Sequence, residues 1–502
     1  MSAHRPRCVP SQCNPSNLAT PPLPDESNPW LPLISCPASF PFELFEIAIS
    51  QLIHHPEYNS TLILRSDTVA EMADGFPTSV PLLKGRQLIR VVHRKLLARR
   101  PGRDGSLEQY CSLYGLLLDD LNDSLGAYSA DTLILTPIVP EGFPLPYYHP
   151  QVLHLAFRYI RSEPPTLRIE VIPLPGTPTD PNARLYRTCL ALLDTLDRYG
   201  WGALTNYKKR VMHDCLVPRE PYQDLYLLMR ERHKHVVDTW QELIDLQDIG
   251  IATYLMLLWK DSYATSAMKE APVANRDEPW RSWPRPPGGF LDFGCGNGLL
   301  THILVQEGYE GAGIDLRART SWSHYPTSTQ SSLHVHAFNP TSSSSEPYFK
   351  PGIFIIGNHA DELTPWVPVF STLHSASGYL SIPCCAWSFD TKYERSSTAM
   401  FPIPGEGSEF ADTLNLGGDG GNGSSYSMYR IWLASLSLYC GWEVECETLR
   451  IPSTRNWAIV GRRRNKDAPA EQPEENVQRI MQNVAERDIF KARKPEGKES
   501  AH

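Results

Sequence analysis

The sequence lacks several features that would place it in a protein class at once. None of its eleven cysteines forms a C-x-x-C pair, which excludes the usual spacing of a structural zinc site, and no metal is expected. The most apolar stretch near mid-chain, residues 251–259, is far shorter than the ~20 residues that a membrane-spanning helix needs. The N-terminus has no apolar signal-peptide core. We therefore expect a soluble, cytoplasmic protein with no membrane contact, whose cysteines, including the adjacent Cys384 and Cys385, are reduced thiols.

The chain also lacks an excess of positive charge. It has 47 Lys and Arg against 56 Asp and Glu, a formal net charge of -9. Binding to phosphates depends on clustered Lys and Arg, so a protein that binds polyanions with its whole surface is excluded. Local basic clusters remain compatible with a nucleic-acid partner. A length of 502 residues, with 41% apolar and 21% charged residues, is typical of a soluble protein with two or three domains.

The N-terminal half predicts a mixture of helices and strands. Apolar residues at helical spacing predict helices over residues 42–53, 87–97 and 184–196, and a charged helix over 222–243. Residues 168–172 alternate between apolar and charged, as in a strand. No catalytic motif is recognisable in this half, which we interpret as an α+β domain.

The C-terminal half shows a different pattern of predicted strands and helices. Strands are predicted at residues 289–293, 311–315, 333–337 and 353–356, separated by helices at 299–306 and 365–373. The first and the last of these strands are apolar, and 333–337 alternates. Further segments follow at 379–382, 426–439, 442–449 and 457–461. Strands that alternate with helices, some of them fully apolar, are typical of a doubly wound sheet buried on both faces, an α/β fold.

These patterns give a domain plan for the whole chain. Residues 405–425 are rich in Gly, Ser and Asp and predict a mobile insertion in the second domain. The plan comprises a disordered leader (1–28), an α+β domain (30–248), a helix and linker (249–287), the α/β domain (288–465) and a charged tail (466–502) with one short helix near 474–492.

The strongest chemical signal is a glycine-rich turn between a strand and a helix. Gly294, Gly296 and Gly298 follow the predicted strand, where glycines let the backbone approach a ligand closely. Asp315 ends the next strand and is placed to accept hydrogen bonds from ribose hydroxyls. The spacing is G-x-G-x-G rather than the G-x-G-x-x-G of dinucleotide sites. Asp292 would repel a pyrophosphate but could orient an ammonium group, so S-adenosylmethionine is the expected cofactor.

A second polar group follows the strand at 353–356. Asn358, His359, Asp361 and Glu362 should face the transferred methyl group, because ligands of open α/β sheets bind beyond the carboxyl ends of the strands. Asn339, after the strand at 333–337, is similarly placed for the adenine edge. The alternative for Asp361, or for the nearby Thr364, is a helix cap.

At this point the sequence resembles the eukaryotic, fungal-type tRNA(Ser) uridine-44 2′-O-methyltransferases. The stretches that carry the resemblance are DFGCGNGLLTHIL, GIDLR, AFNP, IGNHADELTPWVP, IPCC and LRIPSTRNWAIVG, with RRPGRDGSLEQYCSLY, HDCLVPREPYQDLY and IGIATYLMLLW outside the catalytic half. The resemblance runs from about residue 40 to 465. It implies a class I methyltransferase fold, S-adenosylmethionine as the methyl donor, a serine tRNA as substrate and a possible accessory RNA-binding protein. Some members carry a C-terminal zinc finger, which this chain lacks.

Methyl transfer to a ribose hydroxyl requires positioning of the 2′-oxygen and removal of its proton. Asp361, Glu362 and His359 are the candidate proton acceptors, and Lys392 is a further candidate paired with acids. The sequence does not choose among them. Arg455, in the segment LRIPSTRNW, is a candidate for holding a phosphate.

The best basic cluster lies in the N-terminal half. On the predicted helix, Arg86, Arg90 and Arg94 would share one face, and Arg99, Arg100 and Arg103 follow in a loop. We interpret Arg94, Arg99, Arg100 and Arg103 as candidate tRNA contacts, made by shape and backbone recognition. The alternative is an ordinary solvated helix face.

Other functions remain in competition. A methyltransferase of another RNA or of protein is the first, although NHAD stands where enzymes that methylate exocyclic amines often carry D/N-P-P-Y. A non-catalytic adenosyl-binding scaffold in an RNA-modification complex is the second, and the intact Asp292 and Asp315 disfavour it. The glycine spacing disfavours a nicotinamide-dependent oxidoreductase.

Overall fold

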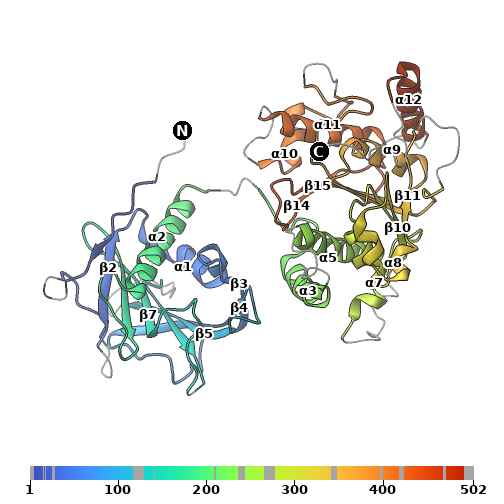
Figure 1. Cartoon of the computed structure of the whole chain (residues 1–502). Helices are drawn as coiled ribbons and strands as arrows, with labels where there is room; N and C mark the ends of the chain where they lie inside the picture. Colours follow the sequence, from blue (N-terminus) through green and yellow to red (C-terminus); the bar gives the residue numbers. More distant parts are fainter. Residues whose placement is uncertain are drawn as a thin grey trace. The chain divides into compact units, whose positions relative to one another are not determined.

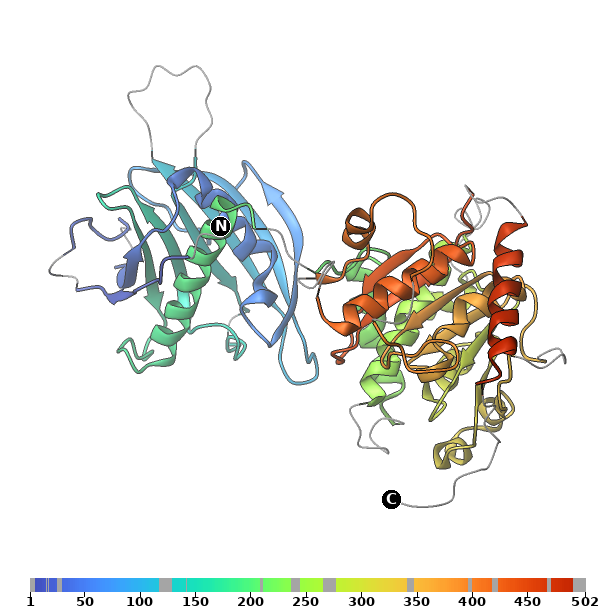
Figure 2. The same ribbon diagram turned by 90° about the horizontal axis from the view of Figure 1, so that it is seen from above.

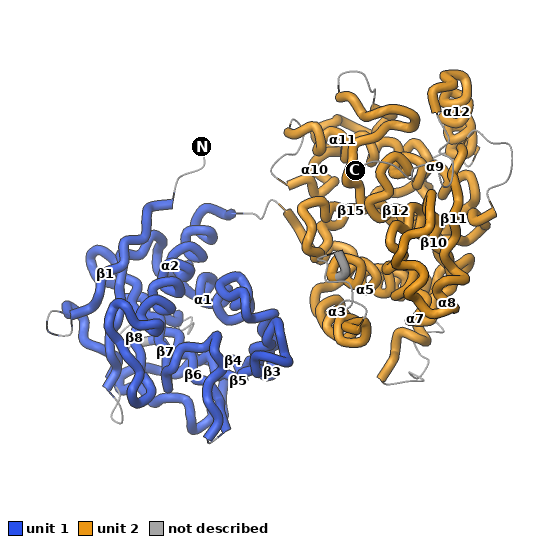
Figure 3. The backbone as a smooth tube through the Cα atoms, viewed as in Figure 1, with its two compact units in different colours: residues 1–208 blue, residues 209–502 orange. Residues whose placement is uncertain are grey.

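The structure, a computed structural model, divides the chain into two compact units. It describes residues 5–490 except 15, 17, 25–28, 117–128, 141, 208–210, 236–243, 265–276, 341–346, 396–399, 418–422 and 467–470. Unit 1 is Met1–Lys208 and unit 2 is Lys209–His502 (Figure 3). None of the described helices is both long enough and apolar enough to cross a membrane.

The described residues of unit 1 form one antiparallel sheet, with helices α1 and α2 on one face (Figures 1 and 2). Its eight strands lie in the order β1-β2-β8-β7-β6-β5-β4-β3. In chain order they are Ser11–Gln12, Leu31–Pro37, Ile63–Met72, Arg86–Ala98, Leu107–Leu116, Thr132–Ile138, Val152–Ile160 and Thr166–Pro173. Helices α1 (Phe45–His54) and α2 (Arg184–Leu204) bury Phe45, Ile49 and Leu196 against the sheet. The predicted α+β composition and the helices near 42–53 and 184–196 are confirmed.

The helix predicted at 87–97 is wrong, because these residues form β4. Val91, Val92 and Leu96 are buried in the sheet, and β-branched residues suit a pleated surface better than a helix. The four-residue spacing of Arg86, Arg90 and Arg94 misled the interpretation, since an even spacing also places side chains on one face of a strand.

The leader predicted at 1–28 is partly ordered. Ser11–Gln12 pairs with β2, and Leu23 is buried with its backbone N–H donating to Glu170. Arg158 and Arg168 donate to the carbonyl of Pro21 and both pair with Glu170. Buried charges need partners, and this segment supplies backbone acceptors to two arginines, so it belongs to the fold.

Unit 2 contains a seven-stranded mixed sheet with helices on both faces (Figure 1). The strand order is β11-β10-β9-β12-β13-β15-β14, of which the first five are parallel and β15 and β14 are antiparallel to their neighbours. The strands are β9 (Phe290–Phe293), β10 (Gly311–Asp315), β11 (Leu333–Val335), β12 (Phe354–Asn358), β13 (Gly378–Ile382), β14 (Glu445–Thr448) and β15 (Trp457–Gly461). The strands predicted at 289–293, 311–315, 333–337 and 353–356 correspond to β9, β10, β11 and β12. Strands β9 and β12 are buried on both faces, whereas β11, at the edge of the sheet, exposes Val335.

The helices of unit 2 form two layers. One core contains residues of α3 (Arg219–Arg232), α5 (Ile244–Ser262) and α7 (Leu299–Gln306), beside which lies the short α8 (Thr327–Gln330). The other contains α9 (Trp366–Leu373), α11 (Ser425–Tyr439) and α12 (Gln472–Arg487). The predicted helices at 299–306 and 365–373 match α7 and α9, and the segment noted at 426–439 forms α11. The end of the helix predicted at 222–243 lies outside the described residues.

The division between the units differs from the predicted boundary at 248, since the described residues from 211 onward belong to unit 2. The reason is α5, because its residues 249–259 are apolar on every side and are buried against the sheet of unit 2. Its Trp259 is fully buried and its ring lies 5.4 Å from Phe354. A helix of this composition needs two apolar neighbours and cannot serve as a linker.

Two segments predicted to be peripheral contribute to the core of unit 2. The insertion at 405–425 contains α10 (Gly407–Thr413), and Phe410, Ala411 and Leu414 are buried, so its described part is not a mobile loop. The charged tail forms α12, which buries Val477 and Ile480. Apolar residues spaced along one face of a charged helix are sufficient to anchor it.

Candidate functional site

The glycine turn lies between β9 and α7, as the sequence predicts. Gly294, Gly296 and Gly298 have φ angles of 89°, 53° and 79°, a region that favours glycine. At Gly298 a Cβ atom would stand 2.9 Å from Leu333 and 3.2 Å from the indole nitrogen of Trp322. The turn therefore needs glycine both for its backbone angles and for space.

The next segment of the chain fixes this turn from outside. Trp322 donates its indole N–H to the carbonyl of Gly296 over 3.0 Å. Ser321 and Tyr325 donate to the carbonyl of Asn297 over 2.7 and 3.1 Å. These bonds hold the carbonyls of the turn, and the N–H groups of Gly294 and Cys295 donate to the carbonyl of Ile314, so the conformation of the turn is fixed from both sides.

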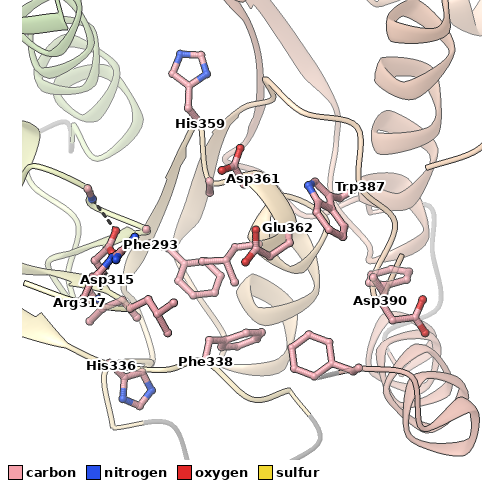
Figure 4. Close-up of a pocket in the computed structure, with 18 of the residues that line it drawn as sticks. Phe293, Asp315, Arg317, His336, Phe338, His359, Asp361, Glu362, Trp387 and Asp390 are labelled. Atoms are coloured by element: carbon pink, nitrogen blue, oxygen red, sulfur yellow. Dashed lines mark hydrogen bonds between the residues drawn. The ribbon is translucent and has the colours of Figure 1, made fainter. Parts of the chain in front are cut away.

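Asp315 ends β10 and reaches back to the turn. Its Oδ2 atom accepts a hydrogen bond from the backbone N–H of Gly296 over 2.9 Å (Figure 4). Arg319 lies 4.0 Å from Oδ1. The carboxylate thus braces the turn while it lines the adjoining cavity.

Asp292 has a different environment from the one expected of a ligand-binding acid. Asp292 is only 1% exposed, and the hydroxyl of Thr301 donates a hydrogen bond to its Oδ2 atom over 2.8 Å. Burial raises the pKa of Asp292 to about 7, with an opposing effect from Thr301 and a further rise from the nearby Asp315. This carboxyl group therefore takes up a proton near neutral pH.

Two adjoining cavities open at the carboxyl ends of the parallel strands. One measures about 570 Å³ and the other about 500 Å³, and both are lined by Gly294, Gly296, Arg319 and His359. The first is lined by Asp315, His336, Phe338 and Trp387 (Figure 4), and also by Phe490. The second is bordered by Asp248, Asp292 and Asn358. The predicted site residues of β9, β10 and β12 therefore share one cleft.

The loop after β12 carries the candidate catalytic residues in a strained backbone. His359 and Asp361 have φ angles of 51° and 45°, values that are uncommon for residues other than glycine and that concentrate at functional sites. The N–H of His359 donates to the carbonyl of Ile382 over 3.1 Å, which ties the loop to β13. Burial lowers the pKa of His359, and Asp361 opposes this effect.

Asp361 and Glu362 both line the larger cavity. The proposed alternative, a helix cap, is wrong: the short 3-10 helix at Asp361–Leu363 and helix α9 both begin without a side-chain cap hydrogen bond. Cys384 donates its thiol to Oδ1 of Asp361 over 3.3 Å. A carboxylate oxygen of Asp361 and the Sγ atoms of Cys384 and Cys385 lie within 4.8 Å of one another.

Not every predicted site residue lines the cleft. Asn339 follows β11, but His336 and Phe338 line the cavity instead. Lys392 lies over the ring of Trp387 at 3.8 Å, beside the cavity, and Arg455 lies over the ring of Tyr426 at the same distance. Tyr426 donates to the carbonyl of Pro383, next to Cys384, so Arg455 lies near the candidate catalytic loop.

The cleft also contains residues that sequence reasoning missed. Asp248, Trp387, Asp390 and Phe490 come from α5, the loop after β13 and the segment after α12. Only Asp248 had a usable signal, since it directly precedes the IGIATYLMLLW motif. The other three residues lie in stretches of sequence that show no recognisable motif.

The four arginines predicted to contact tRNA have two different environments. Arg94 is 3% exposed and donates to Gln109 and to the carbonyls of Leu52 and Ile53, so its assignment as a substrate contact is wrong. It points into the sheet-helix core because its position on β4 faces α1. The other three, Arg99, Arg100 and Arg103, are exposed in the connection between β4 and β5.

Comparison with known proteins agrees with this cleft. Residues 281–340, which contain the glycine turn and Asp315, match the family model "Predicted AdoMet-dependent methyltransferase". The chain is thus a methyltransferase that uses S-adenosylmethionine. Residues 10–210 match "TRM44-like, N-terminal bet v1-like domain", which covers unit 1.

The chain belongs to the family of tRNA (uracil-O(2)-)-methyltransferases. It is 32% identical over 493 residues to the protein of that name from Schizosaccharomyces pombe, covering 89% of both chains. It is 32% identical over 489 residues to the Neurospora crassa protein, again covering 89% of both. Identity to the Saccharomyces cerevisiae protein is 28% over 531 residues, covering 86% of this chain and 87% of the relative. No solved structure matches the chain.

Proposed function

We propose that this chain methylates the ribose 2′-hydroxyl of uridine 44 in serine tRNA, and that unit 2 is a class I methyltransferase fold. The observation that carries the proposal is the common cleft of the glycine turn, Asp315 and the strained loop with Asp361. Supporting it are the names of the relatives, which specify uracil-O(2)- methylation of tRNA. Serine specificity and position 44 follow from the resemblance of the sequence motifs.

The cleft residues fit the expected cofactor. Asp315 is placed for the ribose hydroxyls, and the positive-φ glycines give the close backbone approach that a nucleoside needs. Phe338 and His336 line the part of the cavity beyond Asp315, which suits the adenine base and replaces the predicted role of Asn339. The sulfonium of S-adenosylmethionine, when bound, supplies an electrophilic methyl group with a good leaving group.

The chain must then position the ribose hydroxyl and accept its proton. We assign the proton acceptor to Asp361, because its carboxylate lines the cavity, is oriented by the thiol of Cys384 and belongs to a strained loop. Glu362 and His359 border the same cavity and contribute to orientation. Arg455, close to this loop through Tyr426, would contact the RNA backbone.

Unit 1 would hold the tRNA through Arg99, Arg100 and Arg103. The loop between β6 and β7 lies beside them, because Tyr148 donates to the carbonyl of Gly105 over 2.8 Å. This loop exposes Phe143 and Tyr147, and exposed aromatic rings next to arginines are typical of surfaces that contact RNA backbone and unstacked bases.

The test is transfer of labelled methyl from S-adenosylmethionine to unmodified serine tRNA, with a second tRNA as control. We expect 2′-O-methyluridine at position 44 of serine tRNA alone, and none with Asp361→Ala. A methylated base, or equal labelling of both tRNAs, would contradict the proposal. If neither is labelled, the assay is repeated with a cell extract that lacks the enzyme, to supply an accessory RNA-binding protein.

A further inference from the structure

Asp248 reaches the cofactor cleft from α5, far from the glycine turn in the sequence. The residue is 5% exposed, and with Gln247 it borders the cavity that Gly294, Gly296 and Asn297 also line. The next residues of α5, Ile249 and Ile251, are fully buried. The helix is therefore anchored in the core, and its acid is held at the cavity wall.

Asp248 fixes the orientation of a second polar side chain. Its Oδ1 atom accepts a hydrogen bond from Nδ2 of Asn358 over 3.2 Å. A carboxylate can only accept, so the amide must turn its nitrogen toward Asp248 and its oxygen away. That oxygen, Oδ1 of Asn358, is buried and has no hydrogen-bond partner among the described residues.

A buried carbonyl oxygen without a donor is unfavourable, and such atoms in native proteins call for an explanation. Asn358 lines the same cavity as Asp248, so a ligand group bound there would lie beside both side chains. The group must donate hydrogen bonds, and the carboxylate beside it favours a positive charge. An alkylammonium group meets both requirements.

The acid closer to the glycines is less suited to this role. Asp292 borders the cavity, but its carboxyl group is almost fully buried and receives the hydroxyl of Thr301. Its raised pKa, about 7, reflects a site that disfavours charge. Asp292 is accordingly a brace between β9 and α7, in contrast to the ligand contact that its position in the motif indicates.

We propose that Asp248 and Asn358 bind the α-ammonium group of the methionine portion of S-adenosylmethionine. This assignment rests on the use of that cofactor and not on the identity of the tRNA. The carboxylate supplies the opposite charge, and the free amide oxygen accepts a second hydrogen bond. The same carboxylate repels the phosphates of adenine nucleotides, so the pair also selects the cofactor.

The test is isothermal titration without tRNA, with three ligands that differ only in the amino-acid portion. These are S-adenosylhomocysteine, its deamino analogue, which keeps the carboxylate but lacks the amine, and 5′-methylthioadenosine. We expect the wild-type chain to bind S-adenosylhomocysteine at least about tenfold more tightly than the deamino analogue, as for a charge-assisted hydrogen bond.

Asp248→Asn should remove this difference. Its affinity for S-adenosylhomocysteine should fall about tenfold or more, and its affinity for the other two ligands should stay within about twofold of wild type. Asp261→Asn is the matched control, since Asp261 is an exposed acid on the same helix. It should leave all three affinities unchanged.

Three results would overturn the assignment. The first is a wild-type chain that binds S-adenosylhomocysteine and the deamino analogue equally well, which needs no variant. The second is an equal loss for all three ligands in Asp248→Asn, which indicates a structural role. The third is an unchanged affinity in that variant. Failure of the wild-type chain to bind any ligand would refute both this assignment and the cofactor cleft, whereas tight binding without tRNA methylation would leave the assignment standing and refute only the tRNA reaction.

Discussion

The thiol of Cys384 donates a hydrogen bond to Oδ1 of Asp361 over 3.3 Å, across the ends of neighbouring strands β13 and β12. Burial of Cys384 and its contact with Asp361 raise the pKa of the thiol to about 12. The thiol therefore remains a donor throughout the pH range of ordinary assays. This contact relates the motif IPCC to the candidate base.

Replacement of Asp361 by Asn should lower kcat by about 10²–10⁴-fold, because the amide cannot accept the hydroxyl proton. Cys384→Ala should lower kcat by a smaller factor, about 3–10-fold, since the carboxylate loses a weak donor. Single-turnover methyl transfer measures both. Cys385→Ala is the matched control, an exposed neighbour that should change kcat little. Equal effects of the two cysteine variants would refute orientation by Cys384.

Loss of the Asp315 carboxylate should weaken cofactor binding by about 10²-fold. Asp315→Ala removes the acceptor for the N–H of Gly296 and the proposed partner of the ribose hydroxyls at once. Calorimetric titration with S-adenosylhomocysteine measures the effect. An affinity unchanged from wild type would place the nucleoside elsewhere in the chain.

Asp292 should make the stability of unit 2 fall as pH rises. Its folded pKa, about 7, is higher than its unfolded value near 3.8, so the folded state binds the extra proton between these values. The contribution of the neutral acid is complete below about pH 4 and is lost as pH rises to about 7. Relative to Asp292→Asn, the wild-type melting temperature should decrease across this window and level off above it. If the melting temperatures of the wild type and of Asp292→Asn changed with pH in parallel, the raised pKa of Asp292 would be contradicted.

Charge reversal in the connection between β4 and β5 should weaken tRNA binding. Arg99→Glu with Arg100→Glu should lower affinity and reduce the salt slope, log K against log[salt], by about one for each phosphate that the protein no longer neutralises. Arg187→Glu with Arg198→Glu, two exposed arginines on α2, is the matched control. Filter binding at several salt concentrations measures both. Equal losses of tRNA affinity in the two double variants would indicate that tRNA responds to the overall charge of the protein and not to a defined binding surface at Arg99 and Arg100.

Arg94 should matter for stability alone. Arg94→Ala leaves Gln109 and two backbone carbonyls without their buried donor, which costs about 3 kcal/mol or more. In thermal unfolding, unit 1 of this variant should unfold at a lower temperature than in the wild type. Any variant protein that remains folded should bind tRNA as tightly as wild type, because the side chain is not at the surface.

The parts of the fold that the sequence predicted are those that local pattern determines. Strand β9, the glycine turn and Asp315 follow one another between residues 290 and 315, and the glycines and the acid each meet a steric or chemical requirement that few residue types satisfy. Helix α7 and strand β10 were predicted with their observed bounds. The general pattern of spacing therefore sufficed to place the elements around the glycine turn.

The features that the sequence did not predict depend on contacts between segments that are distant in the chain. A four-residue arginine spacing fits both a helix and a strand, and only the pairing of β4 with β3 and β5 decides between them. The burial of Asp292 and the placement of Asp248 arise from α7 and α5 packing on the sheet. The burial of Asp292 leaves no trace in the residues adjacent to it, and Asp248 is marked only by its position directly before the IGIATYLMLLW motif.

The cleft is enclosed by residues from almost the full length of unit 2, from Asp248 on α5 to Phe490 beyond α12. During synthesis the glycine turn therefore leaves the ribosome well before its last wall exists. A nascent chain, or a fragment cut before α12, would have the nucleotide motif without a closed cavity. Cofactor affinity is consequently a measure of whether the entire unit has folded, and a ligand that binds only the completed cleft selects finished molecules from truncated ones.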